Sequence, residues 1–338
     1  MMEDEVRLAP CVALAALFTA VTLLVPTPAS AAPARLTGDL AAHDPALVRG
    51  GVGQDWYVFS TGDPAIGGGT IQIRTSPDGQ NWRFAGTVWD AMPAWVTAAV
   101  PGANNLWAPE LHRYGDTYYL YYVASVFGTN NSVIALATNT TLDLKDPRYN
   151  WVDRGEVLRS SPGSDYNSID PAIIEDARGI PWMAFGSYLS GIRMVQLQWP
   201  SGLTASSGDE LLHLADRQES PNAIEAPFIS LHDGWYYLFT SWGQCCKGVD
   251  SDYRIVVGRS RAVTGPYLDR DGRSLLKGGG TTLLSTSGDR VGPGGQSVSD
   301  GVLAYHYYDA SAGGAPRLGL QQLSWSNTDG WPELVPEV

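Results

Sequence analysis

The chain has 338 residues, of which 17% are charged, and its formal net charge is −13 at pH 7. Nucleic acids and anionic membrane surfaces are bound through basic patches, so this charge argues against both kinds of partner. Twelve tryptophans and sixteen tyrosines favour a neutral partner with flat faces, such as a sugar, although β-strands are also rich in aromatic residues for structural reasons.

The first predicted element is a signal peptide over residues 1–31. The apolar run Val12–Val25 is too short for a typical membrane span. Ala29-Ser30-Ala31 then has the small-x-small pattern of a cleavage site. The acidic first residues depart from the positive start that such peptides usually have. We expect secretion to the extracellular space and one folded domain over residues 32–338.

Five steps with a proline recur along that domain, and their prolines are 64, 62, 56 and 66 residues apart. Each step is followed by a short apolar run, a turn and an aromatic run. Repeats of this length, built from short strands, are typical of radial arrays. The sequence therefore predicts an all-β fold, a five-bladed β-propeller. The five steps are Asp44-Pro45, Ala108-Pro109, Asp170-Pro171, Ala226-Pro227 and Gly292-Pro293.

The first repeat can be divided into four strands by its period-two and β-branched patterns. We expect them at Ala46–Arg49, Trp56–Ser60, Ile71–Ser76 and Trp82–Ala85. The third strand recurs in the later repeats at Ser132–Thr138, Ile192–Leu197, Arg254–Ser260 and Arg317–Leu323. No long helical periodicity follows the predicted signal peptide.

Carboxylates accompany the steps of the first, third and fourth blades: Asp44, Asp170 and Glu225. We expect them at equivalent positions around one axis. Inverting glycoside cleavage needs two carboxyl groups on opposite sides of the bond, about 6.5–9.5 Å apart. A single Asp-Pro pair is more often only a turn, but three acids in phase favour an active site.

Two cysteines, Cys245 and Cys246, remain after the predicted cleavage, and they are adjacent. A metal site built from the sequence alone would need more ligands at other spacings. A strained vicinal disulfide, two free thiols and an intermolecular bridge all remain open.

Eight short motifs, in order and with the spacing of five blades, resemble glycoside hydrolase family 43, and within it the endo-α-1,5-L-arabinanases. They are His43–Val48, Leu106–Glu110, Tyr166–Pro171, Phe185–Ser187, Ala223–Pro227, Cys245–Gly248, Gly292–Gln296 and Tyr305–Ala310.

The resemblance implies a role for each acid. Asp44 is expected to be the general base and Glu225 the general acid, whose pKa negative neighbours and partial burial should raise. Asp170 is expected to orient the acid and to raise its pKa. His43 precedes the base and is a candidate substrate-binding residue that could also position the base. The alternative is a packing or hydrogen-bonding role only.

The resemblance also implies substrate contacts. Trp107 and Phe127 are candidate platforms for furanose rings, with core packing as the alternative. Asn167 and Ser187 are candidate contacts to sugar hydroxyls, although Asn167 could equally shape the turn before Ile169.

His306 resembles the family histidine that faces the axis and holds a cation, often calcium, through ordered waters. Calcium prefers oxygen ligands, so the alternative is a neutral histidine in the core. No organic cofactor is expected.

These expectations combine into a secreted, inverting, monomeric hydrolase that cuts internal α-1,5 bonds in arabinan of plant pectin. The same acids would serve an α-L-arabinofuranosidase, a β-xylosidase or an exo-galactanase. A non-catalytic sugar-binding propeller and a protein-interaction scaffold are the alternatives from other classes.

Overall fold

The computed structural model describes residue 1 and residues 35–205 and 211–335. The predicted signal peptide, apart from Met1, lies outside the described residues. All described strands belong to one compact unit, residues 33–338. Within the described residues, no helix has both the length and the apolar character that a membrane crossing requires.

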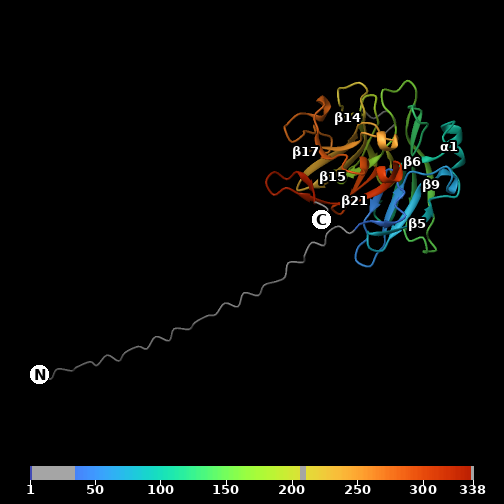
Figure 1. Ribbon diagram of the computed structural model, residues 1–338, viewed down its shortest axis with the longest axis horizontal. Helices are drawn as coiled ribbons and strands as arrows, with labels where there is room; N and C mark the ends of the chain where they lie inside the picture. Colours follow the sequence, from blue (N-terminus) through green and yellow to red (C-terminus); the bar gives the residue numbers. More distant parts are fainter. Residues whose placement is uncertain (2–34, 206–210, 336–338) are drawn as a thin grey trace. The chain divides into compact units, whose positions relative to one another are not determined.

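Five sheets, each built from strands consecutive in sequence, are arranged as the blades of a propeller (Figure 1). This confirms the predicted all-β, five-bladed fold. The bounds of the strands are, in blade 1, β1 (Thr37–Gly38), β2 (Ala46–Val48), β3 (Trp56–Ser60), β4 (Gln72–Ser76) and β5 (Asn81–Thr87); in blade 2, β6 (Leu106–Tyr114), β7 (Thr117–Ala124), β8 (Ser132–Asn139) and β9 (Val152–Ser160); in blade 3, β10 (Ala172–Glu175), β11 (Pro181–Phe185), β12 (Ile192–Gln198), β13 (Leu203–Thr204) and β14 (Leu212–Ala215); in blade 4, β15 (Ile224–His232), β16 (Trp235–Trp242), β17 (Arg254–Ser260) and β18 (Thr281–Leu284); and in blade 5, β19 (Arg290–Ser299), β20 (Val302–Asp309), β21 (Ala315–Trp325) and β22 (Pro332–Leu334).

Helical segments are short and lie between strands. The α-helix α1 (Ala94–Ala99) follows Pro93, whose fixed φ suits a helix start. The 3-10 turns are η1 (Gly67–Gly69), η2 (Gly248–Asp250), η3 (Leu275–Lys277) and η4 (Ala310–Ala312). The predicted strands at Trp56–Ser60 and Arg254–Ser260 coincide with β3 and β17, and the other predicted strands differ from the observed ones by one to two residues at an end.

Five apolar clusters fill the five spaces between neighbouring blades. Phe59 of blade 1 and Leu120 of blade 2, for example, belong to one cluster. The next residue of the same strand, Tyr121, belongs instead to the cluster that contains Met183 of blade 3. Alternate residues of a middle strand are therefore buried on opposite faces. This explains why the aromatic strands read as continuous apolar runs rather than as an alternation of apolar and polar residues.

Blades 5 and 1 close the ring without sharing a strand in the part of the chain that the structure describes. Ser297 accepts a hydrogen bond from the Leu47 amide at 3.0 Å and donates one to the Pro45 carbonyl at 2.7 Å. Ser299 accepts one from the Arg49 amide at 3.0 Å. The buried Ser297 and the partly exposed Ser299 thus pair with backbone groups of the first inner strand that would otherwise have no partner in the protein.

The inner strand of each blade has a step at the axis at which one residue adopts a positive φ. In β6, β15 and β19 this step is a bulge, where the pairing with the next strand skips two residues. The first skipped residue is Ala108, Ala226 or Gly295, with φ of 39°, 49° and 58°. In β19 the pairing skips two residues twice, at Gly292-Pro293 and at Gly295-Gln296, and Gly292 also has a positive φ, of 57°. Of the two, Gly295-Gln296 lines the pocket at the axis together with the steps of the other blades. The step of blade 5 is therefore Gly295-Gln296, and the prediction of Gly292-Pro293 was wrong because the sequence marked the step by its proline.

Two of the three acids occupy the positive-φ position themselves. Asp44 and Asp170 have φ of 50° and 56° and are each followed by proline. Glu225 stands one residue earlier, before Ala226. The predicted equivalence of the three acids is thus correct for the two aspartates and off by one for Glu225. A bulge re-aims side chains, so this offset lets the longer glutamate approach from its own direction.

Gly295 is required at its position. A Cβ there would lie 2.5 Å from Asp44 Oδ1 and 2.7 Å from His306 Nδ1, and φ is +58°. We expect Gly295→Ala to lower the free energy of unfolding by about 1–3 kcal/mol more than its control, because the clash adds to the backbone strain. Gly288→Ala is matched, since φ is +56° with nothing within 4 Å. Equal melting temperatures for the two variants would contradict this packing.

Candidate active site

Two hollows lie along the inner strands. A small pocket at the axial steps is lined by Asp44, Asp170 and Gly295 together with the steps of blades 2 and 4. A cavity of about 890 Å³ lies farther along the same strands. None of the predicted site residues lines the larger cavity. Glu110 borders both hollows, and burial raises its pKa to about 8. The axial pocket is therefore the candidate site.

Asp44 is held by side chains from blades 1 and 5. Its Oδ2 accepts hydrogen bonds from His43 Nδ1 at 2.8 Å and from Thr61 Oγ1 at 2.7 Å. Thr61 Oγ1 in turn accepts the amide hydrogen of Ala108, the step residue of blade 2, at 2.9 Å. The amide of Asp44 donates to His306 Nδ1 of blade 5 at 3.1 Å. The carboxylate is thus fixed from several directions, and its side chain remains 22% exposed to the pocket.

The pKa of Asp44 lies well below its ordinary value. Burial acts to raise it, but the charge and hydrogen bond of His43, with His306 and Thr61, outweigh that effect. The same pairing raises the pKa of His43, although burial opposes the rise. Asp44 is therefore ionised over the whole physiological pH range, as a base that accepts a proton from water must be.

His43 is part of a directional chain of hydrogen bonds. The Cys246 amide donates to Tyr308 Oη at 2.7 Å, and Tyr308 Oη lies 2.9 Å from His43 Nε2. If the Tyr308 hydroxyl donates to Nε2, the proton of neutral His43 is on Nδ1 and faces Asp44. The ring also stacks on His306, with centroids 3.7 Å apart. The side chain predicted to touch substrate is occupied instead in positioning Asp44.

Glu225 has the opposite electrostatic character. Burial is the largest effect on its pKa and raises it. The hydrogen bond of Ser187 lowers the pKa and the charge of Asp44 raises it again, so that it reaches about 7. Ser187 Oγ donates to Oε2 at 2.6 Å, and Tyr253 Oη donates to Oε1. A carboxyl group held in this way can carry a proton near neutral pH and donate it, which is the function of a general acid.

Asp170 is joined to Glu225 through the backbone. Its Oδ2 accepts the amide hydrogen of Ala226 at 2.9 Å. Burial and then the charges of Glu225 and Asp44 raise the pKa of Asp170 well above its ordinary value. The charge of ionised Glu225 thus disfavours ionisation of Asp170.

The four other predicted contacts have different environments. Phe127 is 75% exposed, which excludes core packing for it and leaves the platform interpretation. Trp107 is partly buried, and its Nε1 donates to Asn105 Oδ1 at 2.8 Å. Asn167 accepts from Ser132 Oγ at 2.7 Å, and its carbonyl accepts the Ile169 amide, so its bonds shape the turn. Ser187 is buried and bonds to Glu225, where a sugar contact was expected.

His306 was predicted to hold a cation through water. Burial and then the charge of His43 lower its pKa well below the ordinary value, so the ring is neutral. Because Nδ1 accepts the Asp44 amide, the proton is on Nε2, which has no partner among the described residues. A buried N–H fits a water in the shell of a hydrated cation. It does not fit direct coordination, which requires a lone pair.

Sequence reasoning missed four polar side chains that organise the pocket: Thr61, Tyr253, Gln296 and Tyr308. Gln296 Nε2 donates to the Ala226 carbonyl at 2.6 Å, and Ser241 Oγ donates to Gln296 Oε1 at 2.9 Å. Gln296 occupies the position at which the other four blades have proline. That break in the repeat is the one signal that could have identified it.

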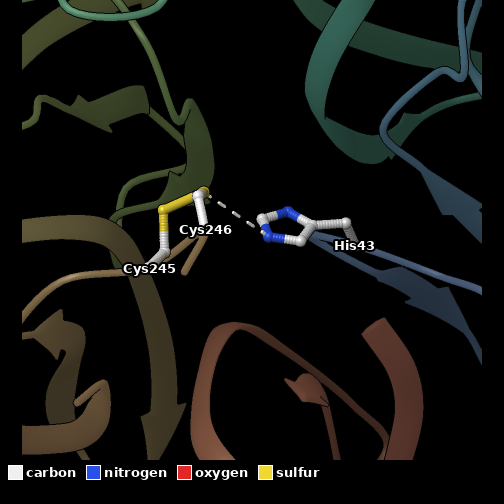
Figure 2. Close-up of side chains that lie close together, drawn as sticks. All are labelled: His43, Cys245 and Cys246. Carbon is white, nitrogen blue, oxygen red and sulfur yellow. Dashed lines mark hydrogen bonds between the residues drawn. A yellow bond between two sulfur atoms is a disulfide. The ribbon is translucent and has the colours of Figure 1, made fainter. Parts of the chain in front are cut away.

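The adjacent cysteines form a disulfide, Cys245–Cys246, which resolves the three alternatives left open by the sequence. The pair lies beside His43, at the edge of the hydrogen-bonded chain that holds Asp44 (Figure 2).

The chain is similar to known proteins over most of its length. Residues 37–332 match the family model for glycosyl hydrolases family 43. The extracellular endo-α-(1→5)-L-arabinanase 1 of Bacillus subtilis is 39% identical over 292 residues, or 86% of each chain. The extracellular exo-α-(1→5)-L-arabinofuranosidase ArbA of Cellvibrio japonicus is 39% identical over 308 residues, again 86% of each chain. The family 43 endo-arabinanase of Bacillus licheniformis superimposes with a TM-score of 0.82 at 38% identity, covering 88% of this chain and 99% of that chain. The chain therefore belongs to glycosyl hydrolases family 43, and it is a glycoside hydrolase.

Proposed function

We propose that this protein is a secreted, inverting hydrolase that cuts internal α-1,5-L-arabinofuranosyl bonds of arabinan. One observation carries the proposal: Asp44 lines the axial pocket, Glu225 directly precedes its lining residue Ala226 and feels the charge of Asp44, and the pKa values of the two acids are shifted in opposite directions. One carboxyl group is thereby ionised and the other protonated at the same pH, which is the state that single-step displacement by water requires.

The reaction then uses each group once. Asp44 Oδ1, the oxygen not engaged by His43 and Thr61, takes a proton from a water molecule. The water oxygen forms a bond to the anomeric carbon as the bond from that carbon to the leaving oxygen breaks. Glu225 gives its proton to the leaving oxygen. Attack from the face opposite the leaving group inverts the anomeric configuration.

The surrounding side chains orient these groups. His43 and Thr61 fix Asp44, while Ser187 and Tyr253 fix Glu225. Asp170 is proposed to hold the acid in place through the Ala226 amide, and its expected effect on the pKa of Glu225 stays a prediction. The proposed calcium contributes no proton transfer.

The substrate and cleavage mode rest on the relatives. Both compared curated relatives are named for α-(1→5)-L-arabinose linkages, one as endo-acting and one as exo-acting, at equal identity. The B. licheniformis structure is named as an endo-arabinanase, which favours endo action. Secretion is supported by the word extracellular in both curated names and by the predicted signal peptide. The monomeric state stays a prediction.

The test is the product profile on linear arabinan, with xylan and galactan beside it. We expect early release of mixed arabino-oligosaccharides with an inverted anomer in the first product. Asp44→Asn and Glu225→Gln should each lower kcat by at least about 10²-fold, because each removes one proton transfer.

Four results would contradict parts of this assignment. Arabinose as the sole early product would overturn endo action, and retention of the anomer would overturn the single displacement. Preferred cleavage of xylan or galactan would favour another specificity of the family. Unchanged sugar release by both variants would assign the acids no catalytic role.

The pH dependence follows from Glu225. Activity should fall as pH rises through about 7, because the acid loses its proton there. Ser187→Ala removes a donor that favours the ionised carboxylate, so it should move the alkaline limb of kcat/KM upward by about one pH unit. Ser168→Ala, which removes a buried hydroxyl without a partner in the described chain, should leave the limb in place. A downward shift in Ser187→Ala would contradict the assignment of Glu225 as the acid.

Calcium is proposed as a hydrated ion whose shell contacts His306 Nε2. Protein equilibrated with calcium and then desalted should contain about one calcium per chain by elemental analysis. His306→Gln should lose that calcium. His213→Gln should retain it, since His213 Nε2 also lacks a hydrogen bond to the described residues but lies beside Asp216, whereas His306 lies beside Asp44. Wild-type protein without calcium, or equal calcium in both variants, would contradict the site.

A further inference from the structure

Three potential metal-ligand atoms lie together beside the axial pocket. The sulfur atoms of Cys245 and Cys246 and one ring nitrogen of His43 are all within 4.8 Å of one another. Cys246 Sγ is 3.9 Å from His43 Nε2, the nitrogen that faces the disulfide in Figure 2. Cys246 is exposed, so solvent reaches this group. No step of the proposed hydrolysis uses either sulfur.

The state of the His43 ring suits a metal ligand. Nδ1 faces Asp44 Oδ2 at 2.8 Å, so its proton is donated there and Nε2 is the nitrogen left for a cation. Although burial opposes the rise, the pairing with Asp44 raises the pKa of His43, so a cation that binds the protonated ring must first displace the proton of Nε2. Zinc-binding histidines usually donate the hydrogen of their other ring nitrogen to a carboxylate, which fixes the tautomer and raises ligand basicity. Asp44 already provides that carboxylate. Besides Cys246 Sγ, Nε2 contacts the hydroxyl of Tyr308 at 2.9 Å, which is a neutral group that a cation can displace.

The distances suit a tetrahedral ion once the sulfurs are free. Zinc bonds of about 2.3 Å to sulfur and about 2.0–2.1 Å to nitrogen imply a sulfur-to-nitrogen separation of about 3.6 Å in a tetrahedron. The observed 3.9 Å needs little adjustment. The two sulfurs must separate to about 3.8 Å, which rotation of two short side chains on a solvent-facing loop can provide. A water molecule would complete the fourth position.

We propose that the Cys245–Cys246 disulfide masks a three-ligand site for a thiophilic divalent cation of the zinc class, which opens on reduction and whose occupation inhibits hydrolysis. An external dithiol supplies two electrons and two protons: the protein's S–S bond breaks, two S–H bonds form, and the dithiol becomes a disulfide. The cation then displaces the two thiol protons and binds both thiolates and the Nε2 lone pair. The net charge of ion and thiolates is zero.

Inhibition follows from the position of His43. A bound cation takes Nε2 from Tyr308 and places positive charge one imidazole ring away from Asp44. The polarised Nδ1–H then binds the carboxylate more strongly and weakens it as a base. This consequence rests on the role proposed for Asp44, whereas binding of the cation does not.

The test measures binding and hydrolysis separately. Cys11→Ser chains are used throughout, so that Cys245 and Cys246 are the only cysteines. A phosphine reduces the disulfide, because a dithiol would itself chelate the metal. Cadmium ion is then titrated, and thiolate ligation is followed by its ultraviolet charge-transfer absorption. Zinc ion is titrated in parallel by calorimetry, and arabinan hydrolysis is measured with zinc and after addition of a chelator.

We expect one equivalent of cadmium on the reduced chain and none on the oxidised chain or on the Cys245→Ser/Cys246→Ser double variant. His43→Gln should weaken binding by at least about tenfold, since it removes a ligand. Zinc should inhibit the reduced chain only, and the chelator should restore its activity.

Several results would overturn the proposal. They are equal cadmium binding by oxidised and reduced chains, binding that survives the double serine variant, and binding unaffected by His43→Gln. Stoichiometric binding without loss of activity would overturn the inhibition. If no form of the protein hydrolyses arabinan, the proposed function fails, while the charge-transfer signal still decides the metal site.

Discussion

The geometry of the site depends on one backbone constraint, the positive φ at the axial step of every inner strand. Asp44 and Asp170 adopt it directly, and Ala226 adopts it immediately after Glu225. Such a conformation costs of order 1–3 kcal/mol in a residue with a side chain and persists only where its surroundings enforce it. Here the proline that follows and the hydrogen bonds between blades provide that enforcement. The strain turns three carboxyl groups toward one point.

The pKa values of the three acids follow from their closeness to one another. Three acids that share a buried pocket cannot all be ionised at low cost, so their pKa values separate. His43 and Thr61 stabilise the charge of Asp44 alone, and its stabilising contribution is lost only in strong acid. Glu225 works in the opposite sense: its burial lowers the stability of the fold as pH rises from about 4.5 to about 7. This loss of stability accompanies the raised pKa that keeps Glu225 protonated near neutral pH.

The sequence predicted the fold well because each blade of a propeller is built from strands that are close in sequence and therefore leaves a local pattern. Strand alternation, turns and the spacing of prolines placed five blades and most strand ends. It placed Asp44, Asp170 and Glu225 near one axis, but it could not resolve the one-residue offset of Glu225, because a bulge is set by pairing between strands. Tyr253 and Thr61 lie in loops with no motif of their own, and only the folded arrangement shows that they bond to Glu225 and Asp44. Tyr308 belongs to the motif Tyr305–Ala310, but its bond to His43 is likewise shown only by the fold. The same holds for Ser187, whose partner is 38 residues away.

The central claim is that Asp44 and Glu225 differ in protonation at the pH of catalysis. Carbon-13 NMR of protein labelled at aspartate and glutamate side-chain carboxyl groups tests it most directly, with Asp44→Asn and Glu225→Gln used to assign the two signals. The account predicts that the Asp44 carboxyl stays ionised throughout the range in which the fold is stable, while Glu225 titrates near pH 7. Titration of Glu225 near its ordinary value of 4.5, or of both groups together, would contradict it.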